Sequence, residues 1–300
     1  MKFHFIINPI AGKSEYQEVI TFLAAYQYEI PNFNYEVYLS QEVGHAKKIA
    51  QSITTAGDVV VSVGGDGTLN EVVNGLHPNC ILGVVPNGTG NDFSAMLDYP
   101  KKLKISEWLR ETIEGKVVTI DLGEVNGYKF VNSCNTGLDS DVLVHYDELR
   151  DKYKNFRKLS YASAIFKTVK NLQPYHAKIT IDGTTLDDRY YLVATTNNGK
   201  FYGGGFKPTP NAEIQDQVLD FCLVRPIKKT SLPYLLRKFM KGKHEGHPAF
   251  ELYQAKEVLI ETHGKVNYAL DGELKYGDYI HIKVLPNALK LLVSAQSKLK

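Results

Sequence analysis

The run Val59–Val63 is the feature that most narrows the fold of this chain. It reads Val-Val-Val-Ser-Val, and such a β-branched run without polar alternation is typical of a parallel strand that is covered on both faces. Gly64-Gly65-Asp66-Gly67-Thr68 follows at once, and apolar residues then recur at helical spacing, at Leu69, Val72, Val73 and Leu76. The segment therefore predicts a strand, a glycine-rich turn and a helix.

The first 125 residues repeat this alternation. Phe3–Ile7, Tyr35–Leu39 and Ile81–Val85 are further short apolar runs, each followed by a helical pattern. Strands that alternate with helices form βαβ units around a parallel sheet. We expect residues 1–125 to form a doubly wound parallel α/β domain.

From about residue 126 the pattern changes to short strands and hairpin turns. Asn126-Gly127 and Asp182-Gly183 are two-residue hairpin signals. One helical segment, near Leu159–Leu172, interrupts the strands. We expect residues 126–300 to form a mainly β, antiparallel sandwich-like domain, with a C-terminal tail able to pack back on the first. The expected strands are Ala177–Ile181, Tyr190–Thr196, Val218–Val224, Val258–Thr262, Tyr279–Val284 and Leu289–Val293.

Charge and composition argue against several classes of binding partner and location. Lys and Arg (35) nearly balance Asp and Glu (33), a net charge of +2, so no global field favours nucleic acid. The three cysteines form no disulfide or zinc pattern. The N-terminus has too short an apolar run for a signal peptide, and no stretch approaches the ~20 apolar residues of a membrane span. These features predict a cytoplasmic protein that meets the inner face of the membrane only peripherally.

Two turns have the composition of phosphate-binding loops. In Gly64–Thr68 the glycines let a phosphate approach the backbone, the following helix start offers free N–H groups, and Asp66 can position Mg²⁺. Thr68 suits a helix cap or a phosphate donor. Asn8–Lys13 occupies the same place after the first strand, without the first glycine of a P-loop. Either segment alone is also compatible with a plain turn.

Together these blocks resemble the diacylglycerol kinase catalytic-domain family and its bacterial lipid-kinase relatives. Gly64–Thr68 and Asn8–Lys13 match its first blocks, and Pro86–Phe93 (PNGTGNDF) matches its GTxNDFA segment. Phe130–Val142, Asn198–Phe206 and Asp271-Gly272-Glu273 match later blocks in order. The resemblance implies an NAD-kinase/phosphofructokinase-like fold with an active site in the interdomain cleft, ATP and Mg²⁺ as cofactors, and phosphorylation of a lipid hydroxyl.

The resemblance also implies the site residues. Glu273 or Asp271 accepts the proton of the hydroxyl, with Asp66 as the third catalytic acid; sequence alone reads Asp271-Gly272-Glu273 as a hairpin turn, and Asp121 also as an ordinary turn acid. Asp66, Asp92 and Asp121, each expected after a strand, hold Mg²⁺–ATP. The full nucleotide-binding set is Asn8, Pro9, Gly12, Lys13, Ser40, Gly64, Gly65, Asp66, Gly67, Thr68, Leu69, Asn70, Thr89, Asp92 and Asp121.

A structural Mg²⁺ is implied in the second domain, held by the Asp216 side chain and the carbonyls of Glu213 and Val218. Gln217 replaces the usual glycine there, so a solvated acidic turn is the other interpretation. Ser231–His244 mixes leucines and Phe239 with lysines, which suits either an anionic membrane surface or a helix packed on the β domain. A second basic cluster comprises Lys152, Lys154, Arg157 and Lys158.

The implied substrate is diacylglycerol, because an acid is present at Asp92. Other lipids, such as phosphatidylglycerol, a sphingoid base or ceramide, stay open, and so does a homodimer. Two other functional classes are alternatives to a lipid kinase. An NAD kinase would carry a GSTAY-like segment in its second half, which this chain lacks. A non-catalytic lipid- or nucleotide-binding protein would be expected to have lost acids that are all present here.

Overall fold

The computed structural model describes residues 1–12, 16–99, 103–150, 157–171, 173–203 and 205–300. Two compact units are formed, and neither is one continuous segment. Unit 1 comprises 1–122, 214–216 and 285–300, and unit 2 comprises 123–213 and 217–284. Among the described residues, no helix combines the length and apolar character needed to cross a membrane.

Unit 1 is built on a parallel sheet. Its elements are β1 (Phe3–Ile7), α1 (Tyr16–Glu29), β2 (Tyr35–Leu39), α2 (His45–Ser52), β3 (Val59–Gly64), α3 (Asp66–Gly75), β4 (Ile81–Pro86), a 3₁₀ turn η1 (Phe93–Met96), α4 (Ile105–Ile113) and the first part of β5 (Lys116–Val125). The strand order is β4-β3-β1-β2, all parallel. The end of the last strand, β15 (Glu273–Val293), adds to this sheet beside β4, with Leu291 opposite Leu82.

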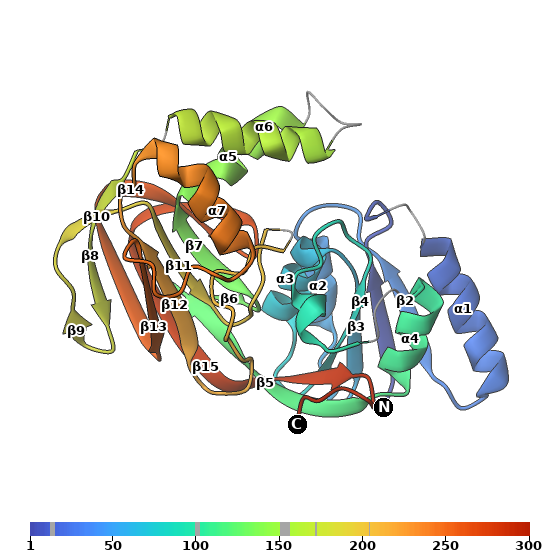
Figure 1. Ribbon diagram of the computed structural model, residues 1–300. Coiled ribbons are helices and arrows are strands. Elements are labelled where there is room, and N and C mark those ends of the chain that lie inside the picture. The colour runs from blue at the N-terminus through green and yellow to red at the C-terminus, as the bar shows by residue number, and fades with distance from the viewer. Residues whose placement is uncertain (13–15, 100–102, 151–156, 172, 204) are drawn as a thin grey trace. The chain divides into compact units, whose positions relative to one another are not determined.

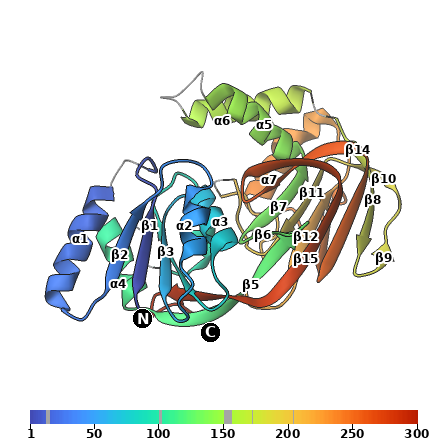
Figure 2. The ribbon, with the colours of Figure 1, turned by 180° about the vertical axis from the view of Figure 1, so that it is seen from behind.

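Helices cover both faces of this sheet, as the all-apolar strands predict. Phe5, Val61 and Val63 point to the face that α1 and α4 cover with Leu23 and Leu109. Figures 1 and 2 show α1 and α4 on one side of β1–β4, and α2 and α3 on the other. All six valines and isoleucines of β1 and β3 are buried. The four strands expected here from the sequence are confirmed to within a residue.

Unit 2 is mainly antiparallel β. Its elements are β6 (Tyr128–Phe130), β7 (Ser133–Gly137), α5 (Leu138–Arg150), α6 (Arg157–Lys170), β8 (Tyr175–Ile181), β9 (Thr184–Thr185), β10 (Arg189–Tyr191), β11 (Val193–Asn197), β12 (Leu219–Val224), a 3₁₀ turn η2 (Lys229–Ser231), α7 (Leu232–Met240), β13 (Phe250–Ala255), β14 (Glu257–Leu270) and most of β15. The strand order is β13-β12-β11-β7-β14-β15, and β8 pairs with β14 and β10.

Three hairpins of unit 2 turn on an Asx-Gly pair. Asn126-Gly127, Asp182-Gly183 and Asp271-Gly272 all have positive φ at both residues, the backbone form of a two-residue type I′ turn. The first two turns were predicted from the sequence and are confirmed, and so is the local hairpin interpretation of the third.

Some expectations for unit 2 were wrong in detail. The expected strand Tyr190–Thr196 is two strands, β10 and β11, because its pairing partner changes from β8 to β7 and β12 at Leu192. The expected strands Tyr279–Val284 and Leu289–Val293 are one strand, β15. The helix α5 was not predicted.

Candidate functional site

The glycine loop, residues 64–68, is a strand end that passes directly into a helix. Gly65 is the N-cap of α3, and Asp66, Gly67 and Thr68 form its first turn. The first intrahelical bond runs from the Leu69 N–H to the Gly65 carbonyl at 3.1 Å. The N–H groups of the first turn precede that bond, so they have no partner within the helix. Gly65 and not Thr68 takes the N-cap position, so of the two interpretations of Thr68 the helix cap was wrong and the phosphate donor stays a prediction.

The glycine loop lies at the point where the strand order of the sheet reverses. β1 has β2 on one side and β3 on the other, so the chain winds outward in both directions from the β1–β3 pair. In open α/β sheets, ligands bind outside the carboxyl ends of strands at this switch point. Asn8 links the turn after β1 to the glycine loop and the strand before it. Its Nδ2 donates to Thr68 Oγ1 at 3.2 Å, and its N–H donates to the Val63 carbonyl at 3.0 Å.

The loop after β4, residues 87–92, packs on the glycine loop without intervening side chains. The Asn87 N–H donates to the Gly64 carbonyl at 2.7 Å. A Cβ added to Gly90 would lie 2.6 Å from Asp66 Oδ2, and one added to Gly65 would lie 3.2 Å from the Gly88 Cα. The two backbones therefore approach closely only because these positions are glycines.

Asn91 closes the loop after β4, and it is a site residue that the sequence analysis did not select. Its side chain accepts from the Gly88 N–H at 3.0 Å and donates to the Gly88 carbonyl at 2.9 Å. Its own N–H donates to Asp66 Oδ2 at 2.8 Å, and its φ is +57°. An asparagine three residues after a glycine in a turn was the available signal, because asparagine tolerates positive φ.

Asp66 connects the two loops through its carboxylate. Burial raises the pKa of Asp66 above its ordinary value, and the N–H groups of Asn91, Asp92 and Phe93 that bond to the carboxylate oppose this shift. A partly desolvated carboxylate is stabilised in its ionised form by a neighbouring cation. Asp66 thus fits a role beside Mg²⁺, with one oxygen already engaged by the Asn91 N–H.

The open side of this arrangement is at Gly67 and Thr89. Both residues are exposed, and a Cβ added to Gly67 would meet nothing within 4 Å. A phosphate could approach the start of α3 from this side, which is the fit expected for a nucleotide triphosphate.

Other members of the predicted nucleotide-binding set differ in access. Gly12 has a φ of +59° and packs on Asn87, and Pro9 is half-buried in the same turn. Ser40 is buried, and its N–H donates to the Ile7 carbonyl at 2.9 Å. Leu69 and Asn70 are 4% and 5% exposed, so their side chains face the protein interior. Lys13 lies outside the described residues.

The acids Asp92 and Asp121 have different surroundings. Asp92 is buried in the loop after β4, immediately before η1. Asp121 was expected after a strand, and this is wrong, because it is a buried residue within β5. Its Oδ1 accepts the Asn287 N–H at 2.7 Å. Asn287 precedes by four residues the Leu291 that pairs with Leu82, so this bond lies toward the amino ends of the parallel strands. The role of Asp121 with Mg²⁺–ATP stays a prediction.

In unit 2 the turn between β14 and β15 gives its two acids different environments. The Asp271 carboxylate accepts three backbone N–H groups, from Val131 at 2.8 Å and from Asn132 and Ser133 at 2.9 Å. The Glu273 side chain is 39% exposed, and its nearest described cation is Lys275 Nζ at 4.0 Å. Of the two acids, Glu273 therefore has the carboxylate that is more available to take a proton.

The segment expected to hold a structural Mg²⁺ keeps the turn that the resemblance implies. Gln217 adopts a φ of +63°, the left-handed conformation that a glycine would take without cost. The Gln replacement therefore does not remove the turn. Glu213 is exposed, and Asp216 and Val218 are half-buried. Carbonyl and carboxylate oxygens suit Mg²⁺, and the site at these three residues stays a prediction.

The helix α7 uses its apolar residues inside unit 2. Leu232 and Phe239 belong to a core cluster with Val193, Cys222 and Val224. Of the two interpretations of Ser231–His244, this packing favours the packed helix with a basic edge. The basic edge comprises Arg237 on the helix and Lys241 and Lys243 directly after it, all three exposed. Lys152 and Lys154 lie outside the described residues, and the side chains of Arg157 and Lys158 are not described.

Both parts of the chain match known families. Residues 2–125 match the diacylglycerol kinase catalytic domain, and residues 132–293 match the family described as the YegS C-terminal NAD kinase beta sandwich-like domain. A protein named diacylglycerol kinase from Staphylococcus saprophyticus is 27% identical over 302 residues, 95% of each chain. A Staphylococcus aureus protein named "putative lipid kinase" is 28% identical over 267 residues, 85% of each chain.

A solved structure has the same fold over nearly the whole chain. It is the crystal structure described as a "putative diacylglycerol kinase" from Bacillus anthracis, with a TM-score of 0.78 and 26% sequence identity. The match covers 98% of this chain and 97% of that one. The predicted fold class, a parallel α/β part followed by an antiparallel β-rich part, is confirmed by this likeness and by the sheet topology.

Proposed function

Because this chain belongs to the diacylglycerol kinase catalytic-domain family, and is therefore a kinase, we propose that it transfers the γ-phosphoryl group of ATP to the hydroxyl of a membrane lipid. Diacylglycerol is the proposed substrate and phosphatidic acid the product. The relatives' names support a lipid, and one of them names diacylglycerol.

The observation that carries the proposal is the meeting of two glycine-rich loops at the start of α3. Phosphoryl transfer depends on positioning the phosphates and neutralising their charge. Here the N–H groups of the first helical turn have no partner within the helix, Gly67 in that turn borders open space, and the Asp66 carboxylate lies within the same turn. The loop would hold the β- and γ-phosphates, and Asp66 would orient Mg²⁺ or its waters. Mg²⁺ would supply charge neutralisation.

In this proposal Glu273 takes the proton of the lipid hydroxyl. Its carboxylate is partly exposed, whereas the carboxylate of Asp271 is already bonded to three N–H groups. Asp271 instead positions the turn that presents Glu273. The peripheral encounter with the membrane belongs to the same proposal, through the exposed basic edge of α7.

The test is a transfer assay with γ-labelled ATP and Mg²⁺, in which diacylglycerol, phosphatidylglycerol, sphingosine and ceramide are offered in mixed micelles beside NAD in solution. We expect label in phosphatidic acid. Label in another lipid would keep the lipid kinase and replace the substrate. Label in NAD alone, or in none of the acceptors, would overturn the proposal.

The same assay examines the loop through a matched pair of variants at one position. Gly67→Asp and Gly67→Asn introduce side chains of equal size into open space, and an acid in a first helical turn is favourable for the helix. Only the Asp variant adds a negative charge where the phosphates would bind. We expect it to weaken ATP binding at least about tenfold relative to the Asn variant, at unchanged melting temperature. Equal ATP binding by the two variants would show that the phosphates bind elsewhere.

A further inference from the structure

A second group of chemically active side chains lies in unit 2, apart from the Asp271 turn. We call it the histidine cluster, and it comprises His176, Asp188 and His263. His176 Nδ1 lies 3.2 Å from Asp188 Oδ1, and His263 Nε2 lies 3.2 Å from Asp188 Oδ2. One potential ligand atom from each residue lies within 4.8 Å of the others.

The strand register brings these residues to one face of the sheet. His176 is on β8, opposite Tyr190 of β10. On the other side of β8, Thr262 of β14 pairs with Ala177, so His263 is one position further along, beside His176. Ala177 is fully buried in the core. Because side chains alternate along a strand, His176 points away from that core, to the same face as Tyr190 and His263.

The contacts of the cluster differ from those of a simple ion pair. His176 Nδ1 is buried and has no hydrogen-bond partner among the described residues, although Asp188 Oδ1 is only 3.2 Å away. The two atoms are close but not aligned for a hydrogen bond. Ligands of a tetrahedral metal, with bonds of about 2.0–2.1 Å, lie roughly 3.3 Å apart and point to a common centre. In the cluster each histidine lies 3.2 Å from a different oxygen of Asp188, with His263 hydrogen-bonded to it, and one ligand atom of each residue lies within 4.8 Å of the others. The three side chains are therefore close enough to be drawn onto one metal ion.

We infer that His176, Asp188 and His263 form a binding site for a divalent transition metal of the Zn²⁺ class. Two imidazole nitrogens and one carboxylate oxygen suit Zn²⁺ or Co²⁺, whereas Mg²⁺ prefers oxygen ligands alone. Three protein ligands leave a fourth position for water. The site is therefore distinct in chemistry from any Mg²⁺ site at Asp66 or Asp216.

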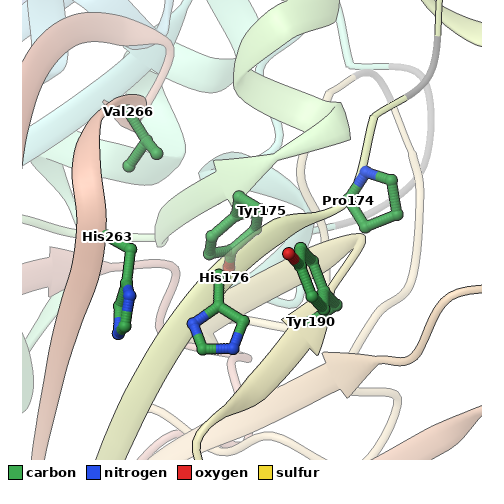
Figure 3. A pocket seen from close by; sticks show the side chains of 6 residues that line it. All are labelled: Pro174, Tyr175, His176, Tyr190, His263 and Val266. Atoms are coloured by element: carbon green, nitrogen blue, oxygen red, sulfur yellow. The ribbon is translucent and has the colours of Figure 1, made fainter.

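A pocket lies beside the two histidines of the proposed site, where a water or another fourth ligand of the metal could bind. His176 and His263 line a pocket of about 400 Å³ together with Pro174, Tyr175, Tyr190 and Val266. Figure 3 shows the two imidazole rings side by side, with Tyr190 next to His176 and Val266 above His263. The Tyr190 ring is 4.7 Å from the His176 ring and meets it edge-on, which limits the directions that the imidazole can take.

The experiment uses the full chain after treatment with a chelator, titrated with Co²⁺ and followed by visible absorption. Tetrahedral Co²⁺ with nitrogen ligands absorbs far more strongly than hydrated Co²⁺. We expect one Co²⁺ per chain, displaced by Zn²⁺ and not by excess Mg²⁺. Absence of a stoichiometric band, or displacement by Mg²⁺, would overturn the inference.

Variants then assign the ligands. Asp188→Asn and His263→Gln change exposed side chains, so both should fold, and we expect each to weaken Co²⁺ binding at least about tenfold. The matched control is His281→Gln. His281 also pairs with a carboxylate, that of Glu257, but no third metal-ligating side chain lies beside this pair in the described structure. Loss of binding in the control to the same degree would refute the assignment. As an independent readout, Zn²⁺ should raise the melting temperature of the wild type and the control only.

Discussion

The carboxylates of the candidate site differ in how many backbone N–H groups are hydrogen-bonded to them. Asp271 accepts three backbone N–H groups, Asp121 accepts that of Asn287, and Asp66 accepts those of Asn91, Asp92 and Phe93. The Glu273 side chain is 39% exposed, and its carboxylate lies 4.0 Å from Lys275 Nζ. A carboxylate already bonded to several N–H groups is a poor proton acceptor. The division between structural acids and the candidate base is thus made at the level of single hydrogen bonds.

Asp139, in the first turn of α5, should make the stability of unit 2 depend on pH. Burial raises its pKa to about 6, and the hydrogen bond from the Tyr202 hydroxyl opposes that shift. The pKa in the unfolded chain is lower, so between about pH 4 and pH 6 the folded protein holds more protons than the unfolded one. The free energy of unfolding should therefore fall as pH rises through this window, by at most about 3 kcal/mol.

Asp139→Asn should remove this part of the pH dependence. The measurement is the free energy of unfolding from urea titrations at several pH values between 4 and 7, for the wild type and the variant. The pKa values of Asp66 and Asp141 are also raised by burial, so the difference between the two proteins isolates Asp139. Parallel curves for both would contradict the prediction.

At the scale of elements, the turn of the β14–β15 hairpin is fixed by hydrogen bonds that the backbone near β7 donates to the Asp271 carboxylate. Its two-residue turn, with φ of +46° at Asp271 and +91° at Gly272, places the Asp271 carboxylate against the three N–H groups before and at the start of β7. The next residue, Glu273, is the first of β15 and pairs with Leu270. These hydrogen bonds therefore fix the position of the candidate base.

Asp271→Asn and Glu273→Gln should separate anchoring from chemistry. Asp271→Asn replaces the charged carboxylate that accepts the three backbone N–H groups by a neutral amide. We therefore expect the free energy of unfolding to fall by about 1.5–3 kcal/mol. Glu273→Gln should leave that free energy within about 0.5 kcal/mol but lower kcat by about 10²–10⁴-fold. Glu124→Gln, on β5 and paired with Lys283, is the control and should change neither. Full kcat in Glu273→Gln would remove Glu273 as the base.

The elements also show where sequence patterns suffice. Strands with a buried face on both sides, such as Val59–Val63, and Asx-Gly turns are set by local chemistry, so they were predicted. The sequence predicted two strands, Tyr279–Val284 and Leu289–Val293, but β15 runs through Pro286 and through Asn287, which has a φ of +51°. At this point Asp121, a residue distant in the sequence, accepts the Asn287 N–H, and a local pattern does not reveal such a partner. The same limit applied in part to Asn91, because its partner Gly88 is local but its partner Asp66 is 25 residues away and only the fold brings it close.

At the scale of the whole molecule, charge is balanced and any attraction to a membrane must be local. The net charge is +2 over 300 residues, too little for a general field. The basic edge of α7 concentrates Arg237, Lys241 and Lys243 on exposed positions, beside Tyr234 and Met240, which are 59% and 47% exposed. The buried face of α7 is not available to lipid, so charge would dominate the encounter.

Replacing Arg237, Lys241 and Lys243 together by glutamine should therefore weaken binding to anionic vesicles and leave the fold intact. Each basic side chain near such a surface contributes about 1 kcal/mol, so the triple variant should bind about 100-fold more weakly in sedimentation with phosphatidylserine-containing vesicles. The control replaces three exposed lysines elsewhere, Lys48, Lys290 and Lys298, and changes the net charge equally. Because the attraction is electrostatic, wild-type binding should also weaken as salt is raised. An equal loss in the control would mean that net charge, not the α7 edge, governs docking, and undiminished binding to neutral vesicles would assign it to apolar contacts instead.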